Sequence, residues 1–159
     1  MGDGGGCHPR DNIAMSYLSD KLNLSHNWFE HIMQQREKQT EWLVELIIEN
    51  IKNFKVNILG KSFKAESNLT LGSPAILLQN LLKEKNVKAN IWDPIVDQKF
   101  EEYSKKYSWD KEAQLFFIAT KHEEFNKFPF YSGSVVIDPW RYISPRNDIK
   151  IIRVGDSKK

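Results

Sequence analysis

The spacing of hydrophobic positions changes near residue 53 and divides the chain into two parts. Before that point apolar residues recur every three to four positions, which is typical of amphipathic helices. One helix is expected after Pro9, and a second is expected after Ser25, its predicted N-cap, to about Asn53. The second helix is long and contains no Gly or Pro, so its apolar stripe needs a partner surface. That predicted stripe comprises Phe29, Ile32, Met33, Trp42, Leu43, Leu46 and Ile47.

After Asn53, short apolar runs alternate with helical segments. The predicted strands cover residues 56–60, 88–92, 115–119, 135–138 and 149–154. Helices are predicted at 75–82 and 98–106, with at most a short one at 122–127. Strands that are apolar throughout and alternate with helices indicate a mostly parallel α/β sheet covered on both faces. Ligands bind beyond the carboxyl ends of such strands, where we expect Gly60, Asp93, Thr120 and Asp138 to cluster.

Composition excludes several classes of protein. Hydrophobic residues make up 40% and charged residues 28%, so the chain has enough apolar surface for a globular core. The net charge of +2 is too small to indicate a nucleic-acid partner. A single cysteine excludes an internal disulfide and favours a reducing, cytoplasmic location. No apolar run reaches the length of a membrane span, so we expect no membrane partner.

Candidate chemistry gathers around Cys7. Gly5 and Gly6 precede it, and glycines allow a backbone to approach a substrate closely. A cysteine just before a helix is stabilised as the thiolate by the helix dipole, and Arg10 adds a second positive charge. Asp11 lies one turn away, where a carboxylate can orient or deprotonate water. These residues predict covalent catalysis. Taken alone they also fit a small buried cysteine near a flexible end.

The segment Gly-Gly-Gly-Cys-His-Pro-Arg-Asp at residues 4–11 resembles the Gly-Gly-x-Cys-x-x-Lys-Asp loop of UDP-glucose and GDP-mannose dehydrogenases. The resemblance implies that Cys7 attacks the aldehyde formed at the sugar C6. A thiohemiacetal then gives up a second hydride to become a thioester, and water releases the carboxylate. Asp11 falls on the acid that assists this water. Arg10 stands where the family usually has Lys, which keeps the charge with a different geometry.

A second segment resembles the family's nucleotide-binding motif. Phe63-Lys64 followed by Ser73-Pro74 is similar to its Phe/Tyr-Lys...Ser-Pro pattern, which implies binding of the UDP part of a substrate. Lys64 is then expected to meet the diphosphate and Phe63 to pack on a sugar or base. The intervening stretch differs, because Leu71 stands where the family commonly has Arg. Without the resemblance an alternative remains open, in which Lys64 is a surface residue and Phe63 a core residue without a binding role.

The resemblance extends further along the chain. Residues 92–94 are similar to the family's Tyr-Asp-Pro, and residues 120–125 to its Thr-x-His-x-Glu-Phe, which implies a structural role for His122. Residues 138–141 are similar to its substrate-contacting Asp-x-Arg. Trp140 occupies the Arg position there and Arg141 follows, so Arg141 is a further substrate-binding candidate. The histidines show no metal-ligand spacing, and we predict no metal.

Together, pattern and resemblance predict a helical connector at residues 1–53 that carries the cysteine loop. The resemblance implies that its long helix is the family's dimer-forming central helix, and a core helix of a monomer stays open as the alternative. A Rossmann-like three-layer domain with a mostly parallel sheet of about five or six strands is expected at 54–159. No Gly-x-Gly-x-x-Gly loop follows a strand, so the NAD-binding domain that the resemblance implies is expected before this chain. We therefore expect that Met1 is not a natural start and that this chain alone is inactive.

Three functional hypotheses follow. The first is the C-terminal part of an NAD-dependent nucleotide-sugar dehydrogenase acting as a homodimer. UDP-glucose, converted to UDP-glucuronate, is the favoured substrate because the family's basic-acidic pair after the cysteine is kept. GDP-mannose and UDP-N-acetylmannosamine are the alternatives. The second hypothesis is a non-catalytic nucleotide-binding or dimerisation module. The third is a small thiol enzyme using Cys7 and His8, although adjacent residues rarely face each other and no third orienting group is evident.

Overall fold

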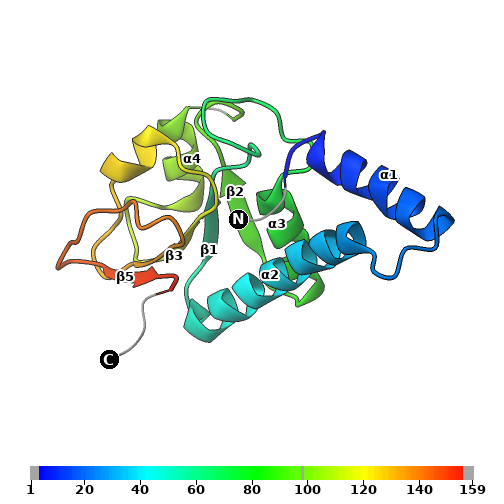
Figure 1. Cartoon of the computed structure of the whole chain (residues 1–159). Coiled ribbons are helices and arrows are strands. Elements are labelled where there is room, and N and C mark those ends of the chain that lie inside the picture. The colour runs from blue at the N-terminus through cyan, green and yellow to red at the C-terminus, as the bar shows by residue number, and fades with distance from the viewer. Residues whose placement is uncertain (1–3, 98, 156–159) are drawn as a thin grey trace.

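The computed structural model describes residues 4–97 and 99–155, and it begins with two packed helices (Figure 1). Helix α1 covers His8–Lys21 and α2 covers Trp28–Ile51. Asn27, and not the predicted Ser25, is the N-cap of α2, because its side chain accepts the Glu30 N–H. The Asn27 amide also donates to the Ser16 carbonyl at 3.2 Å and to the Ser16 hydroxyl at 2.9 Å. The cap therefore also fixes the turn between the helices.

Helix α2 is buried only along the C-terminal half of its predicted stripe. Thr40, Leu43, Val44 and Ile47 are its buried residues, and they face the sheet. Trp42 also belongs to the predicted stripe but is 46% exposed, so within this chain no partner surface covers it. It lies one residue from Leu43, about 100° around the helix, and therefore turns away from the sheet. The N-terminal half of α2 packs against α1 instead.

Five parallel strands form one sheet in the order β2-β1-β3-β4-β5. The strands are β1 (Val56–Leu59), β2 (Ala89–Trp92), β3 (Leu115–Ile118), β4 (Val135–Asp138) and β5 (Lys150–Arg153). Helices α3 (Pro74–Glu84) and α4 (Phe100–Tyr107) and the 3-10 helix η1 (Glu123–Lys127) connect them. Each lies where the hydrophobic pattern predicts it, and the parallel α/β class is confirmed.

The sheet carries a different core on each face, which confirms the three-layer arrangement. On one face α2 and α3 bury aliphatic residues, including Leu43, Ile47 and Leu78, against β1, β3 and β4. On the other face an aromatic cluster includes Trp92, Trp109, Phe116, Phe125, Phe128 and Phe130. Helix α2 thus shares a core with the sheet across the predicted division at residue 53.

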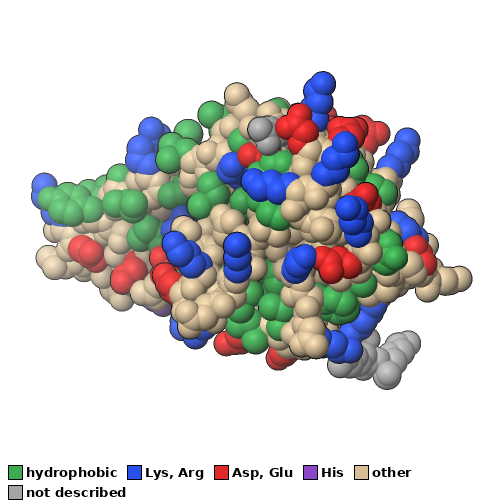
Figure 2. All heavy atoms as spheres, turned by 180° about the vertical axis from the view of Figure 1, so that it is seen from behind, with side chains coloured by type: hydrophobic (Ala, Val, Ile, Leu, Met, Phe, Trp, Pro, Cys, Tyr) green, Lys and Arg blue, Asp and Glu red, His purple; other side chains and the backbone are tan. Residues whose placement is uncertain are grey.

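Charged and hydrophobic side chains are distributed differently over the surface. From behind, lysine and arginine side chains are spread over the face, and green hydrophobic side chains lie along the projecting helical end (Figure 2). Ile13, Tyr17, Leu22, Leu24 and Trp28 belong to this helical part and are 57–68% exposed. Among the described residues, no helix has the length and apolar character to cross a membrane.

Candidate functional site

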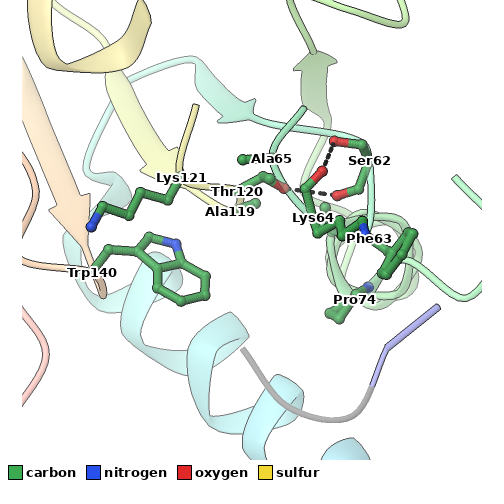
Figure 3. A pocket seen from close by; sticks show the side chains of 10 residues that line it. Ser62, Phe63, Lys64, Ala65, Pro74, Ala119, Thr120, Lys121 and Trp140 are labelled. Atoms are coloured by element: carbon green, nitrogen blue, oxygen red, sulfur yellow. Dashed lines mark hydrogen bonds between the residues drawn. The ribbon is translucent and has the colours of Figure 1, made fainter. Parts of the chain in front are cut away.

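A pocket of about 240 Å³ opens at the carboxyl ends of β1 and β3 (Figure 3). Its walls are the loop after β1 (62–65), the first turn of α3, the end of β3 (119–121) and Trp140 after β4. After β1 the chain continues to β2, toward one edge of the sheet, and after β3 it continues to β4, toward the other edge. The loops there diverge and leave a crevice, which is where parallel α/β sheets bind ligands.

Gly60 and Thr120, which follow β1 and β3, are in close contact beside this crevice. A Cβ on Gly60 would lie only 2.5 Å from the Thr120 Cβ, and Gly60 has a φ of +99°. The Thr120 hydroxyl donates to the Ser62 carbonyl at 2.8 Å. The loops after β1 and β3 are therefore locked together. Asp138 ends β4 and accepts the backbone N–H groups of the turn that follows it, from Trp140, Tyr142 and Ile143.

A buried carboxylate, Asp93, holds the loop that carries Phe63 and Lys64. It accepts backbone hydrogen bonds from both sides, namely from Lys61, Ser62, Ile95 and Val96. Burial would raise the pKa of Asp93, but the His122 hydrogen bond and these N–H groups lower it well below its usual range. Asp93 therefore stays ionised and fixes the loop after β1 to the end of β2.

Ser62, His122 and Asp93 form a cluster that resembles a catalytic triad by composition only. His122 Nε2 lies 3.0 Å from Asp93 Oδ2 and 3.1 Å from the Ser62 hydroxyl. In a triad the histidine uses one ring nitrogen for the acid and the other for the nucleophile. Here a single nitrogen faces both groups, and all three residues are buried. The cluster braces the loop, which fits the structural role predicted for His122.

The cysteine loop lies directly against this loop. The Gly5 N–H donates to the Gly72 carbonyl at 3.2 Å. Gly5 has a φ of +85°, and a Cβ there would lie 2.9 Å from the Phe63 ring. Gly72, at φ +68°, would place a Cβ 2.3 Å from the Gly5 oxygen. The structure therefore brings the predicted Gly5 and Phe63 together, with glycine required where the two backbones meet.

Cys7 is the N-cap residue of α1 and is exposed. Asp11 donates its backbone N–H to the Cys7 carbonyl at 2.9 Å, which is the first hydrogen bond of the helix. The Asp11 side chain pairs with Arg10 at 3.0 Å, and both side chains are exposed. The side-chain hydrogen bond between Arg10 and Asp11, the charge of Asp11 and nearby Cys7 raise the pKa of Arg10 above its usual value. The predicted catalytic residues therefore share one exposed helix start.

The pocket offers positive charge and aromatic surface. Lys64 is exposed, with Nζ 5.5 Å from the centroid of the half-buried Phe63 ring. Lys121 is a second lysine on the wall, and sequence reasoning missed it. The start of α3 also lines the pocket, capped by the Ser73 side chain, which accepts the Ala75 N–H at 3.2 Å. A helix N-terminus and two lysines favour an anion such as phosphate.

Arg141 does not line the pocket, whereas its neighbour Trp140 does. The backbone of Arg141 is left-handed, with a φ of 55°. A Cβ on Gly155 would lie 3.6 Å from an Arg141 guanidinium nitrogen, so this side chain lies beside the Gly155 turn. Trp140 was noted from the sequence only as a departure from the family pattern.

The described residues do not form a dinucleotide site of the Gly-x-Gly-x-x-Gly kind. Gly60 and Gly72 lie between β1 and α3, but Thr120 and Gly5 occupy the space beside them. The approach of a pyrophosphate to their backbone is therefore blocked. Across residues 4–97 and 99–155, no group of three or more His, Cys, Asp or Glu side chains could hold a metal ion.

Comparisons with known proteins give one consistent result. Residues 57–145 match the UDP-binding domain of the UDP-glucose/GDP-mannose dehydrogenase family. The chain is 30% identical to GDP-mannose 6-dehydrogenase of Pseudomonas aeruginosa over 153 residues, which are 96% of this chain and 31% of the relative. It is 23% identical to a putative UDP-glucose 6-dehydrogenase of Bacillus subtilis, over 94% of this chain and 37% of the relative.

Solved structures agree in fold. GDP-mannose dehydrogenase from Pseudomonas aeruginosa matches with a TM-score of 0.73 and 21% identity, over 95% of this chain and 39% of that one. A UDP-glucose dehydrogenase from Pyrobaculum islandicum matches with a TM-score of 0.74 and 22% identity, over 94% and 37%. This chain spans about a third of the length of these relatives. With more than half of its residues matched by the family model, the chain belongs to the UDP-glucose/GDP-mannose dehydrogenase family.

Proposed function

We propose that this chain is the C-terminal part of an NAD-dependent nucleotide-sugar dehydrogenase that oxidises the sugar C6 hydroxyl to a carboxylate. One observation carries the proposal: the cysteine loop packs on the Phe63 ring that lines the pocket. A substrate whose phosphates bind at Lys64 and the start of α3 can extend from there toward Cys7. The pocket volume of about 240 Å³ is below the range of complete ligand pockets, so it fits only part of a nucleotide sugar.

In the proposed reaction Cys7 forms a thiohemiacetal and then a thioester, which water hydrolyses. The exposed position at a helix start leaves the thiol open to a substrate. Asp11 is the proposed acid that assists water. Its pairing with Arg10 keeps it oriented beside the helix start. Gly6 is exposed and can let the substrate approach the backbone, whereas the space beside Gly5 is taken by the Phe63 ring, so Gly5 acts by bringing Phe63 to the loop. A substrate contact by Arg141 stays a prediction.

Two NAD molecules, one after the other, would each accept one of the two hydrides that oxidation of an alcohol to a carboxylate removes. Because the glycines between β1 and α3 are blocked, we propose that another part of the parent protein binds NAD. This chain alone is then inactive. UDP-glucose is the proposed substrate, with UDP-glucuronate as product. GDP-mannose is the alternative substrate, because one relative is named GDP-mannose 6-dehydrogenase and another a UDP-glucose 6-dehydrogenase.

We also propose a homodimer formed through the helical part. The large apolar side chains left exposed there support an interface, because monomers rarely leave such patches uncovered. Trp28 is 63% exposed, Trp42 46% and Ile48 38%. Sedimentation equilibrium should give twice the chain mass. A monomeric mass at high micromolar concentration would count against the dimer.

The binding proposal is tested by calorimetry with UDP-glucose on wild type and Lys64→Ala. Loss of a charge-assisted contact to phosphate should weaken binding about tenfold or more. Lys88→Ala is the matched control, because Lys88 is exposed and precedes β2, at the amino ends of the strands, whereas the pocket lies at their carboxyl ends. Equal binding by wild type and Lys64→Ala would refute the role of Lys64. No binding by wild type would refute the proposed function of the pocket.

A further inference from the structure

Trp140 forms the wall of the pocket farthest from the cysteine loop. In Figure 3 Trp140 and Lys121 lie at one end, and Phe63 and Pro74 lie at the other. Phe63 marks the cysteine end, because Gly5 packs on its ring. A ligand that reaches from Trp140 to Phe63 therefore has its reacting end near Cys7 and its opposite end on the indole.

The indole is held in place before any ligand arrives. Its Nε1–H donates to the Ile118 carbonyl at the end of β3, at 3.1 Å. The backbone N–H of Trp140 donates to Asp138 Oδ1 at 3.1 Å. Asp138 Oδ2 accepts from the N–H groups of Tyr142 at 2.6 Å and Ile143 at 2.7 Å. With its polar edge satisfied, Trp140 remains 39% exposed in the pocket wall. A fixed ring loses little freedom on binding.

The groups between the two aromatic walls suit phosphate. Lys64 and Lys121 line the pocket, and so does the start of α3. Lys121 Nζ lies 5.0 Å from the centroid of the Tyr142 ring, so this cation is held beside the Trp140 turn. In a nucleotide sugar the order of groups is base, ribose, diphosphate, sugar. With phosphate in the middle and the sugar toward Cys7, the base lies at Trp140.

We propose that Trp140 stacks on the nucleobase of the substrate and supplies affinity for the base without selecting its identity. This inference rests on the proposed function and names the base end of the same site. Every base has a π-face, so stacking on an aromatic ring depends little on sequence. Selection between UDP and GDP then comes from groups at the base edge and not from the indole.

The test is calorimetry on the 159-residue chain with UDP, GDP and inorganic pyrophosphate. Trp140→Ala should weaken UDP and GDP by roughly 5- to 150-fold each, the range measured when a stacked aromatic is removed. The two losses should agree within about threefold, since the indole presents the same face to both bases. Trp140→Phe should keep most of the affinity. Pyrophosphate binding should be unchanged in both variants, which also shows that the pocket is intact.

Tyr131→Ala is the matched control, because Tyr131 is also an exposed aromatic residue but lies before β4 and does not line the pocket. Unchanged UDP binding by Trp140→Ala overturns the stacking inference. So does an equal loss of pyrophosphate binding, because the tryptophan would then support the phosphate site and not the base. If Lys64→Ala weakens UDP and Trp140→Ala does not, the inference fails alone. If wild type binds neither nucleotide, the proposed function fails with it.

Discussion

Replacing Asp93 by Asn tests whether one buried carboxylate holds the nucleotide loop. Each Asp93 oxygen accepts two backbone N–H groups, with Oδ2 facing Lys61 and Ser62, and Oδ1 facing Ile95 and Val96. An asparagine has one acceptor oxygen and one NH₂ group. Whichever way it is oriented, its NH₂ faces two backbone donors that lose their acceptor.

The loss can be estimated from those two donors. A buried donor left unsatisfied costs about 1–3 kcal/mol, so Asp93→Asn should lower the free energy of unfolding by about 3 kcal/mol. With a urea m-value of about 2 kcal/mol/M, the midpoint should fall by about 1.5 M. Asp110→Asn is the control, because Asp110 is exposed in the turn before β3. A midpoint shift below about 0.5 M would refute the argument that these donors depend on Asp93.

The destabilisation by Asp93→Asn should depend on pH. The pKa of Asp93 is lower in the folded chain than its unfolded value of about 3.9. The stability that Asp93 contributes is therefore present above about pH 4 and is lost as the pH falls below it. The difference in unfolding free energy between wild type and Asp93→Asn should shrink from pH 5 to pH 2. A difference that is constant over this range would contradict the lowered pKa.

Two further predictions concern the joint between the cysteine loop and the pocket. Gly5→Ala should speed hydrogen exchange at its own amide about 5- to 30-fold, because a left-handed non-glycine residue costs about 1–2 kcal/mol and its Cβ would meet Phe63. Gly6→Ala is the control, with its Cβ 3.5 Å from Leu71 and unchanged exchange expected. Ser73→Ala should lower the melting temperature by about 3 °C through loss of the α3 N-cap, worth about 1 kcal/mol. Exposed Ser144→Ala should leave it unchanged, and equal shifts would show that the cap is not the cause.

The hydrophobic pattern was sufficient to predict which helices and strands form. It was insufficient to predict where they end and which side chains they bury. The pattern predicts a strand at Val135–Asp138 because three apolar residues precede an aspartate. In the structure all four residues are buried. Ser25 and Asn27 are both good N-caps, and the choice depends on a hydrogen bond to Ser16 eleven residues earlier. Local spacing contains no information about that contact.

The same limit explains what was missed at the site. Gly5 and Phe63 could each be proposed from a motif, but their contact joins segments far apart in sequence. Trp140 and Arg141 are adjacent, but only Trp140 lines the pocket, and Arg141 has a left-handed backbone. Such a conformation is unusual for a residue other than glycine, so the sequence favoured Arg141 as a substrate-binding residue, whereas the structure places Trp140 in the pocket wall.

The geometry of the cysteine loop argues that the proposed chemistry needs a second surface over this one. A thioester must react with one oriented water and be protected from the rest of the solvent, which requires a closed site. Cys7 is exposed, and Leu71, which lies beside the neighbouring Gly6, is 75% exposed. Leu71 stands where the family commonly has Arg, and its side chain contacts the Gly6 position. An apolar surface at this place favours closure by packing rather than by an ion pair. Under the proposed function, Leu71→Arg should therefore weaken closure over Cys7 while leaving UDP binding at Lys64 and Trp140 unchanged.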